Sequence, residues 1–167
     1  MVLTKQELAS ALKKEVGILL HLAGKLDREH IDYRPTAKQR SSLELLRYLS
    51  VMGPALVATA KDGAFNRDAW VAEIAAADKR DFDETLKVIA SQPEQYERLL
   101  ADMSDADFRA EMTGFDGSKL SKGAFIVALV LGGYAAYRTQ LFCYLKACGR
   151  EELGTVNLWR VADAVPA

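Results

Sequence analysis

A stripe of apolar residues near the start of the chain constrains the fold more than any other feature. Its members recur every three or four residues, at Leu8, Leu12, Val16, Leu19, Leu22 and Leu26. This spacing places them on one face of an α-helix, with the nearby lysines on the other faces. Thr4 and Glu7 have the spacing of a capping box, which satisfies the first backbone amides of a helix. We therefore predict a helix that begins after Thr4 and ends at about Leu26.

Three later segments repeat this amphipathic spacing, so the chain is predicted to be all-α. The predicted ranges are a second helix from Ser41 or Ser42 to the break KDGAFNRD, a third over about 82–103, and a fourth from Ser121 or Lys122 to about Cys148. Gly149 is a natural C-cap for the fourth helix. Pro54 and Pro93 fall inside the second and third helices, where a proline kinks or interrupts the helical hydrogen bonds.

The connections complete the predicted architecture. A short helix over residues 67–76 lies between the second and third long helices, and Ser104 opens a helical stub. The segment TGFDGSKLS is predicted to be a Gly-rich loop, because no strand pattern of useful length appears. These elements predict a four-helix bundle, with connections too long for a simple up-down-up-down order. We predict a single domain over residues 1–167, with a tail ordered in part through Leu158 and Trp159.

Charge is distributed unevenly along the chain, although the formal net charge is only −1. The sums are +4 for residues 1–61, −8 for 62–116 and +3 for 117–167. No segment gathers the lysines and arginines that neutralise a phosphate backbone, so we predict no nucleic-acid partner. The acidic middle segment is most simply a solvated helical face.

The sequence favours a soluble cytoplasmic protein. Its N-terminus MVLTKQELAS has no apolar core and so does not resemble a signal peptide. Cys143 and Cys148, five residues apart, do not pair easily on a helix, and two cysteines without a framework fit a reducing compartment. The longest uncharged run, Gly123–Tyr137, has 15 residues, which is too short to span a bilayer. We therefore predict no membrane partner.

Few residues have the chemistry of a metal or catalytic site. The two histidines, His21 and His30, are interpreted as surface or satisfied core residues, because a metal site needs three convergent ligands. Cys143 and Cys148 have no neighbouring His or acid and are interpreted as packing residues before reactive thiols. Tyr134, Tyr137 and Tyr144 recur along the last helix. The residues alone favour an aromatic core stripe over a pocket lined by phenols.

Several motifs occur in an order that resembles the DinB/YfiT-like superfamily of four-helix bundles. They are DYRP followed by SSLELLRYL, YRTQL in the place of that family's His-Arg-Gly-Gln-Leu, and NLW near the C-terminus. Together they span most of the chain. The resemblance implies a DinB-like bundle and a homodimer, as in many relatives. Characterised relatives include thiol-dependent S-transferases and isomerases that activate a small thiol on a divalent metal.

The resemblance also implies where a metal would lie. Three histidines of the family correspond to Tyr48, Gly133 and Tyr137 in this sequence. Glycine has no side chain to offer, and phenols with pKa near 10 are poor ligands at neutral pH. The family glycine after the last histidine–arginine pair is here Thr139. We therefore predict that the metal site is degenerate, with no metal and no cofactor.

The cleft itself is predicted to remain as a ligand site. Tyr48 and Tyr137 are predicted to face each other across the former metal position and to hydrogen-bond each other, with Met52 and Tyr134 at its mouth. The candidate ligand-binding residues are Tyr48, Met52, Gly133, Tyr134 and Tyr137. This predicts a small-molecule-binding or interaction protein whose catalytic residues, if any, are unknown.

Two alternatives stay open. One is a metal- or thiol-dependent transferase or hydrolase of the DinB/YfiT type that uses non-standard ligands, with His21 and Cys143 as the residues to test. The other is a purely structural protein in which the tyrosines are core and the surface serves a partner. An ordered small molecule near Tyr48 favours binding, whereas a metal on His21 favours an enzyme.

Overall fold

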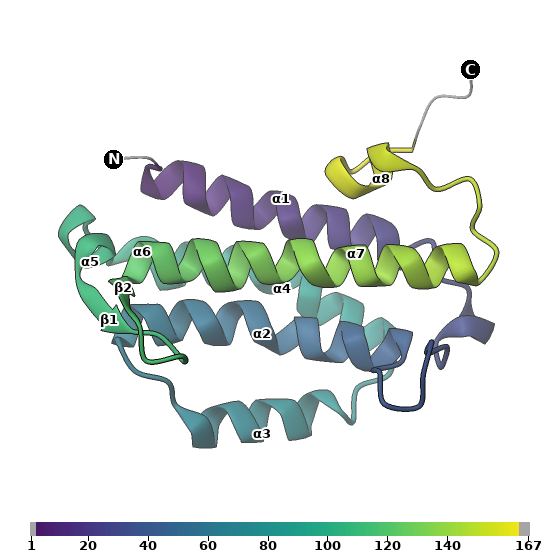
Figure 1. Ribbon diagram of the computed structural model, residues 1–167, viewed down its shortest axis with the longest axis horizontal. Coiled ribbons are helices and arrows are strands. Elements are labelled where there is room, and N and C mark those ends of the chain that lie inside the picture. The colour runs from purple at the N-terminus through teal and green to yellow at the C-terminus, as the bar shows by residue number, and fades with distance from the viewer. Residues whose placement is uncertain (1–2, 164–167) are drawn as a thin grey trace.

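The computed structural model describes residues 3–163 as a bundle of four long helices packed side by side (Figure 1). They are α1 (Lys5–Ala23), α2 (Ser42–Asp62), α4 (Phe82–Ala101) and a final helix built from α6 (Lys122–Phe125), η2 (Ile126–Leu131) and α7 (Gly132–Ala147). The resulting fold class is the all-α bundle that the periodic apolar spacing predicts.

Side-chain caps define where the helices begin. Thr4 and Glu7 form the predicted capping box at α1, and Ser41, rather than Ser42, forms one with Glu44 at α2. α1 ends at Ala23, three residues before the predicted end. The apolar stripe continues beyond the helix because Leu26, in the following turn, is still buried. Apolar periodicity thus predicts which residues are buried more accurately than it predicts the residue at which the helix ends.

The order of the helices is not up-down-up-down. α2 and α4 run in the same direction, because α3 (Arg67–Ala77) returns the chain along the outside of α2 (Figure 1). α4 packs against α1 and α2, and α7 packs against the same two helices from the other side. α2 and α4 both continue through their prolines, Pro54 and Pro93, so the predicted interruption at Pro93 is absent.

Shorter elements close the ends of the bundle. They are η1 (Arg28–His30), α5 (Asp105–Arg109), β1 (Glu111–Thr113), β2 (Lys119–Ser121) and α8 (Thr155–Trp159). β1 and β2 form an antiparallel hairpin in which Met112 pairs with Leu120. The segment predicted as a loop is therefore partly a hairpin. Its turn requires Gly117, whose φ is 81°. In α8, Asn157 is buried whereas Trp159 is exposed.

The last helix contains a π-helical segment, η2, that periodicity does not predict. A π-helical turn holds more residues than an α-helical turn, so it shifts which side chains face the bundle. Ile126 and Val130 of η2 point into the core, and Ala128 and Leu129 border a pocket on the other side. Such segments are frequent near functional sites.

Candidate site: an aromatic pocket beside the bundle core

A pocket of about 400 Å³ lies between α2 and the η2–α7 helix. One wall carries Tyr48, Met52 and Leu56 from α2, which are spaced by one helical turn. The opposite wall comes from Gly133 and Tyr137 of α7, with three small or apolar neighbours, Ala128, Leu129 and Ala136. Every lining side chain is uncharged.

Aromatic rings from three further segments border the same pocket. Phe65 precedes α3, Trp70 lies on α3, and Phe115 lies in the turn of the hairpin. Their rings form a continuous series of edge and tilted contacts. The centroids of Tyr48 and Trp70 are 6.0 Å apart, those of Trp70 and Phe65 5.8 Å, and those of Phe65 and Phe115 5.3 Å. Contacts of this geometry stabilise ring packing beyond the area that they bury.

Four of the five predicted site residues line this pocket. Tyr48 and Tyr137 meet edge to face, with centroids 5.2 Å apart and planes at 69°. Gly133 faces Met52 so closely that a Cβ at position 133 would lie 3.0 Å from the Met52 Sδ. The glycine therefore makes room for the methionine. The three positions that the family resemblance assigns to metal ligands do converge on one site.

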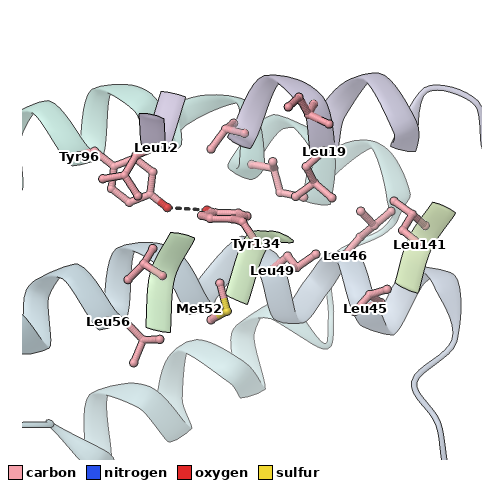
Figure 2. Close-up of a cluster of buried hydrophobic side chains, with 14 of the residues drawn as sticks. Leu12, Leu19, Leu45, Leu46, Leu49, Met52, Leu56, Tyr96, Tyr134 and Leu141 are labelled. Carbon is pink, nitrogen blue, oxygen red and sulfur yellow. Dashed lines mark hydrogen bonds between the residues drawn. The ribbon is translucent and has the colours of Figure 1, made fainter. Parts of the chain in front are cut away.

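Tyr134 does not lie at the mouth of this pocket, and that prediction is wrong. Its side chain is fully buried in the bundle core, where its hydroxyl meets the Tyr96 hydroxyl (Figure 2). It also donates a hydrogen bond of 2.6 Å to Gln92 Oε1. The physical reason is helical geometry: Tyr134 and Gly133 are adjacent in α7 and so differ by about 100° around the helix axis.

The buried tyrosine pair depends on Gly53 of α2. A Cβ at this position would overlap the hydroxyl oxygens of both Tyr96 and Tyr134. Gln92 ties the network to α2 by donating a hydrogen bond of 2.9 Å from Nε2 to the Leu49 carbonyl. Burial raises the pKa of both phenols well above the ordinary value, so they are neutral and satisfied. This network belongs to the core and not to the pocket.

The pocket phenols differ from the core phenols in their hydrogen bonding. Tyr48 and Tyr137 adjoin, and their hydroxyls interact closely enough to raise the pKa of Tyr48. Within residues 3–163 neither of these two hydroxyls is joined to a third protein group. Tyr134, Tyr96 and Tyr144 all have partners at hydrogen-bond distance.

The environment of Tyr48 keeps its hydroxyl protonated. Burial, followed by hydrogen bonding and electrostatic interaction with the adjacent Tyr137 phenol, raises the pKa of Tyr48 to about 12, and the positive charge of Arg40 opposes the rise. Tyr48 is therefore a neutral hydrogen-bond donor at pH 7.

A cation lies just outside the pocket. The Arg40 guanidinium carbon is 4.0 Å from the centroid of the Tyr48 ring, within the range of a cation–π contact. Arg40 and Tyr48 also border a separate depression of about 390 Å³, which contains Arg47 and Asp78. Arg47 is engaged there with the Arg80 carbonyl. Tyr48 thus separates an uncharged pocket from a charged one.

The remainder of the YRTQL motif is structural. Arg138 is buried, with its Nε 2.9 Å from Glu15 Oε2 of α1. Burial raises the pKa of Glu15, and the positive charge of Arg138 partly opposes that rise. Gln140 donates to the Tyr144 hydroxyl, which itself donates to the Arg40 carbonyl. Only Tyr137 of this motif reaches the pocket.

A larger groove of about 800 Å³ runs between α2, α3 and α4. Its lining mixes apolar side chains such as Leu99 with charged ones such as Lys61, Glu73 and Arg80. Only Phe65 and Trp70 are shared with the aromatic pocket, and none of the predicted site residues borders it. We therefore place the candidate site in the smaller pocket.

The alternative residues His21 and Cys143 do not border the aromatic pocket. His21 Nε2 lies 3.2 Å from Asp163 Oδ1, beside Asn157 of α8, whereas Cys143 is exposed on α7. The described part of the chain contains no group of three or more His, Cys, Asp or Glu residues placed to hold a metal ion. The donor set at Tyr48, Gly133 and Tyr137 also does not fit a divalent metal, because it offers at most two neutral phenols.

Three features of the site were not predicted from the sequence. They are the π-helical segment, the aromatic rim from Phe65, Trp70 and Phe115, and the contact of Arg40 with Tyr48. The rim residues come from connections whose positions depend on how α3 and the hairpin fold back. The one signal in the sequence was the presence of large aromatic residues in otherwise polar connections, in KDGAFNRD and TGFDGSKLS.

Solved structures with this arrangement exist despite low sequence identity. A DinB-like protein, YjoA, from Bacillus subtilis superposes with a TM-score of 0.66 at 17% identity, covering 88% of this chain and 95% of its own. The fold is DinB-like. The mycothiol-dependent maleylpyruvate isomerase superposes with a TM-score of 0.58 at 10% identity, and the chain spans 61% of its length. A histidine-to-alanine mutant of that isomerase gives a TM-score of 0.55 at 11% identity.

These similarities establish the DinB-like fold and no more, because all identities are far below 25%. No family model matches the sequence. No curated protein matches it either. The function of this DinB-like bundle therefore has to be argued from its own residues.

Proposed function

We propose that this DinB-like protein binds a small organic molecule in the aromatic pocket, without the metal of the family. The observation that carries the proposal is the convergence of two adjacent phenols, joined to no third protein group within residues 3–163, on an uncharged pocket of about 400 Å³. A concave, mostly apolar site with a few convergent polar groups is the usual form of a small-molecule site.

The residues at the family's ligand positions support binding and not metal chemistry. Tyr48 and Tyr137 occupy two of these positions, and Gly133 leaves space at the third that the Met52 side chain partly fills. A phenol binds zinc or nickel well only after it loses its proton, and burial opposes that loss at Tyr48. Hydrogen bonding and apolar contact are therefore the chemistry that these side chains offer.

A fragment screen by thermal shift tests the proposal. The variant Ala136→Phe places a ring in the pocket, because Ala136 lines it from α7. Thr139→Phe is the matched control, since Thr139 is exposed one turn later on the same helix and does not line the pocket. We expect a subset of fragments to raise the Tm of the wild type and of Thr139→Phe but not of Ala136→Phe. Fragments that fail to discriminate between the two variants would contradict the proposal.

Metal content provides a second test. Tag-free protein purified without chelator and challenged with zinc, nickel and manganese is expected to retain much less than one equivalent after dialysis. The measurement is elemental mass spectrometry on a defined protein concentration. Near-stoichiometric retention would refute the metal-free part of the proposal and direct attention to His21, Cys143 and nearby carboxylates.

A further inference from the structure

We infer that the ligand of this pocket is an uncharged, flat ring compound that carries a carbonyl-type acceptor oxygen. Its ring would lie against Trp70 and Phe65, and its oxygen would accept a hydrogen bond from the pair of hydroxyls on Tyr48 and Tyr137. This inference rests on the proposed function and specifies its ligand class.

The shape and lining of the pocket select a ring. Tyr48, Tyr137, Trp70, Phe65 and Phe115 all contribute aromatic surface, and their rings meet at edge or tilted angles. Edge-to-face series of this kind leave faces and edges for another ring to pack against. A volume of about 400 Å³ is at the small end of ligand sites, which fits one or two fused rings and not a long chain.

The absence of charge from the lining selects a neutral molecule. An ion that entered this pocket would lose hydration without meeting a charge or a dense set of dipoles. The Arg40 guanidinium lies over the ring of Tyr48 and borders the neighbouring depression, not this pocket. Tyr48 therefore stands between that positive charge and the pocket.

The two phenols select an acceptor atom. The two pocket hydroxyls interact with each other, and within residues 3–163 neither is joined to a third protein group, so one of their two protons is left to donate. In the core, by contrast, the hydroxyls of Tyr134 and Tyr96 are hydrogen-bonded to each other, and Tyr134 also donates to Gln92. A carbonyl oxygen accepts this remaining proton of the pocket pair, which an alkyl group cannot do.

Three ligands that share one ring system test the inference. The neutral ketone 2-acetonaphthone has the acceptor, 2-ethylnaphthalene lacks it, and 2-naphthoate replaces it with a negative charge. We expect the ketone to bind the wild-type protein about 3- to 10-fold more tightly than the alkyl compound, as for one net hydrogen bond. We expect 2-naphthoate to bind at least about tenfold more weakly than the ketone, because its charge would be desolvated. Dissociation constants from ligand-observed NMR titrations measure both ratios.

Variants connect these ratios to the phenols. The double variant Tyr48→Phe/Tyr137→Phe should remove the advantage of the ketone and leave 2-ethylnaphthalene binding within about twofold of wild type, because the apolar lining is unchanged. Tyr33→Phe is the matched control, because Tyr33 is half-buried and does not line the pocket. An advantage of the ketone that persists in the double variant would overturn the assigned role of the phenols.

The remaining outcomes separate this inference from the proposed function. Tightest binding by 2-naphthoate, weakened in Arg40→Ala, would overturn the neutral class and assign the anion to Arg40. If none of the three binds but the fragment screen finds ligands sensitive to Ala136→Phe, the ligand class is wrong and the pocket proposal stands. If the screen also finds none, both are wrong.

Discussion

At the scale of single residues, Phe substitutions of a core tyrosine and of a pocket tyrosine are expected to lower the stability by different amounts. Tyr134→Phe leaves Gln92 Oε1 without its donor and removes the partner of the Tyr96 hydroxyl in a fully buried site. We expect a loss of about 1–3 kcal/mol in the free energy of unfolding. Tyr137→Phe should cost less, at most about 1 kcal/mol, because its hydroxyl interacts only with the half-buried Tyr48 phenol within residues 3–163.

Urea denaturation of both variants beside the wild type measures this difference. The m-value has to stay constant for the midpoints to report stability. Equal losses in the two variants would contradict this ranking and show that the Tyr137 hydroxyl contributes as much stability as the fully buried Tyr134 hydroxyl.

Tyr48 also predicts how stability changes in alkali. The pKa of Tyr48 rises to about 12 in the fold, mainly through burial, whereas an unfolded tyrosine titrates near its ordinary value of 10.0. The unfolded state therefore loses its proton first, so the contribution of Tyr48 is fully present below pH 10 and is lost as pH rises from about 10 to about 12. We expect Tyr48→Phe to lose less stability than the wild type across this interval. Denaturation midpoints at about pH 9 and about pH 11 test the expectation, and parallel losses would contradict it.

At the scale of the helices, alanine substitutions of two helical glycines are expected to change stability in opposite directions. In an exposed helix interior, Gly→Ala stabilises by about 0.5–1 kcal/mol. A Cβ on Gly132 of α7 would meet only the Val127 carbonyl, at 3.8 Å, so Gly132→Ala should show this gain. Gly53→Ala should instead destabilise by about 1–3 kcal/mol, because its methyl group enters the space of the Tyr96 and Tyr134 hydroxyls.

Thermal and urea unfolding of the two variants measure the contrast. If Gly53→Ala loses stability because it displaces the phenols, the combination Gly53→Ala/Tyr96→Phe should recover part of the loss. A gain in stability from Gly53→Ala alone would mean that the core phenols pack elsewhere.

At the scale of the whole molecule, the final helix has an exposed apolar face. The segment Lys122–Ala147 is long and apolar enough to cross a bilayer by length and composition, as is α2, although core helices pass the same test. For α2, 67% of the apolar window is buried, against 33% for Lys122–Ala147. The expectation of no membrane partner therefore stays a prediction, as does the cytoplasmic location.

We propose a second copy of the chain as the partner of this face. No charged residue lies between Lys122 and Arg138, so two copies related by a twofold axis would meet there without like-charge repulsion. We expect light scattering to give twice the 18.4 kDa chain mass. Val127→Glu, at an exposed position, should weaken the dimer at least about tenfold by burying a charge. A monomeric wild type would contradict the dimer, and co-flotation with vesicles would assign the face to lipid.

Local sequence patterns predicted the helices, and the family resemblance predicted which residues stand where relatives carry metal ligands. Apolar periodicity and capping boxes are local properties, so Thr4, Ser41 and the helical stripes predicted the bundle, and the motif order predicted that Tyr48, Gly133 and Tyr137 converge. The packed structure was needed to show that Tyr134 belongs to the core and that Phe65, Trp70 and Phe115 border the pocket. The physical reason is that a π-helical turn and long connections set side-chain directions through packing between distant segments, which no local spacing records.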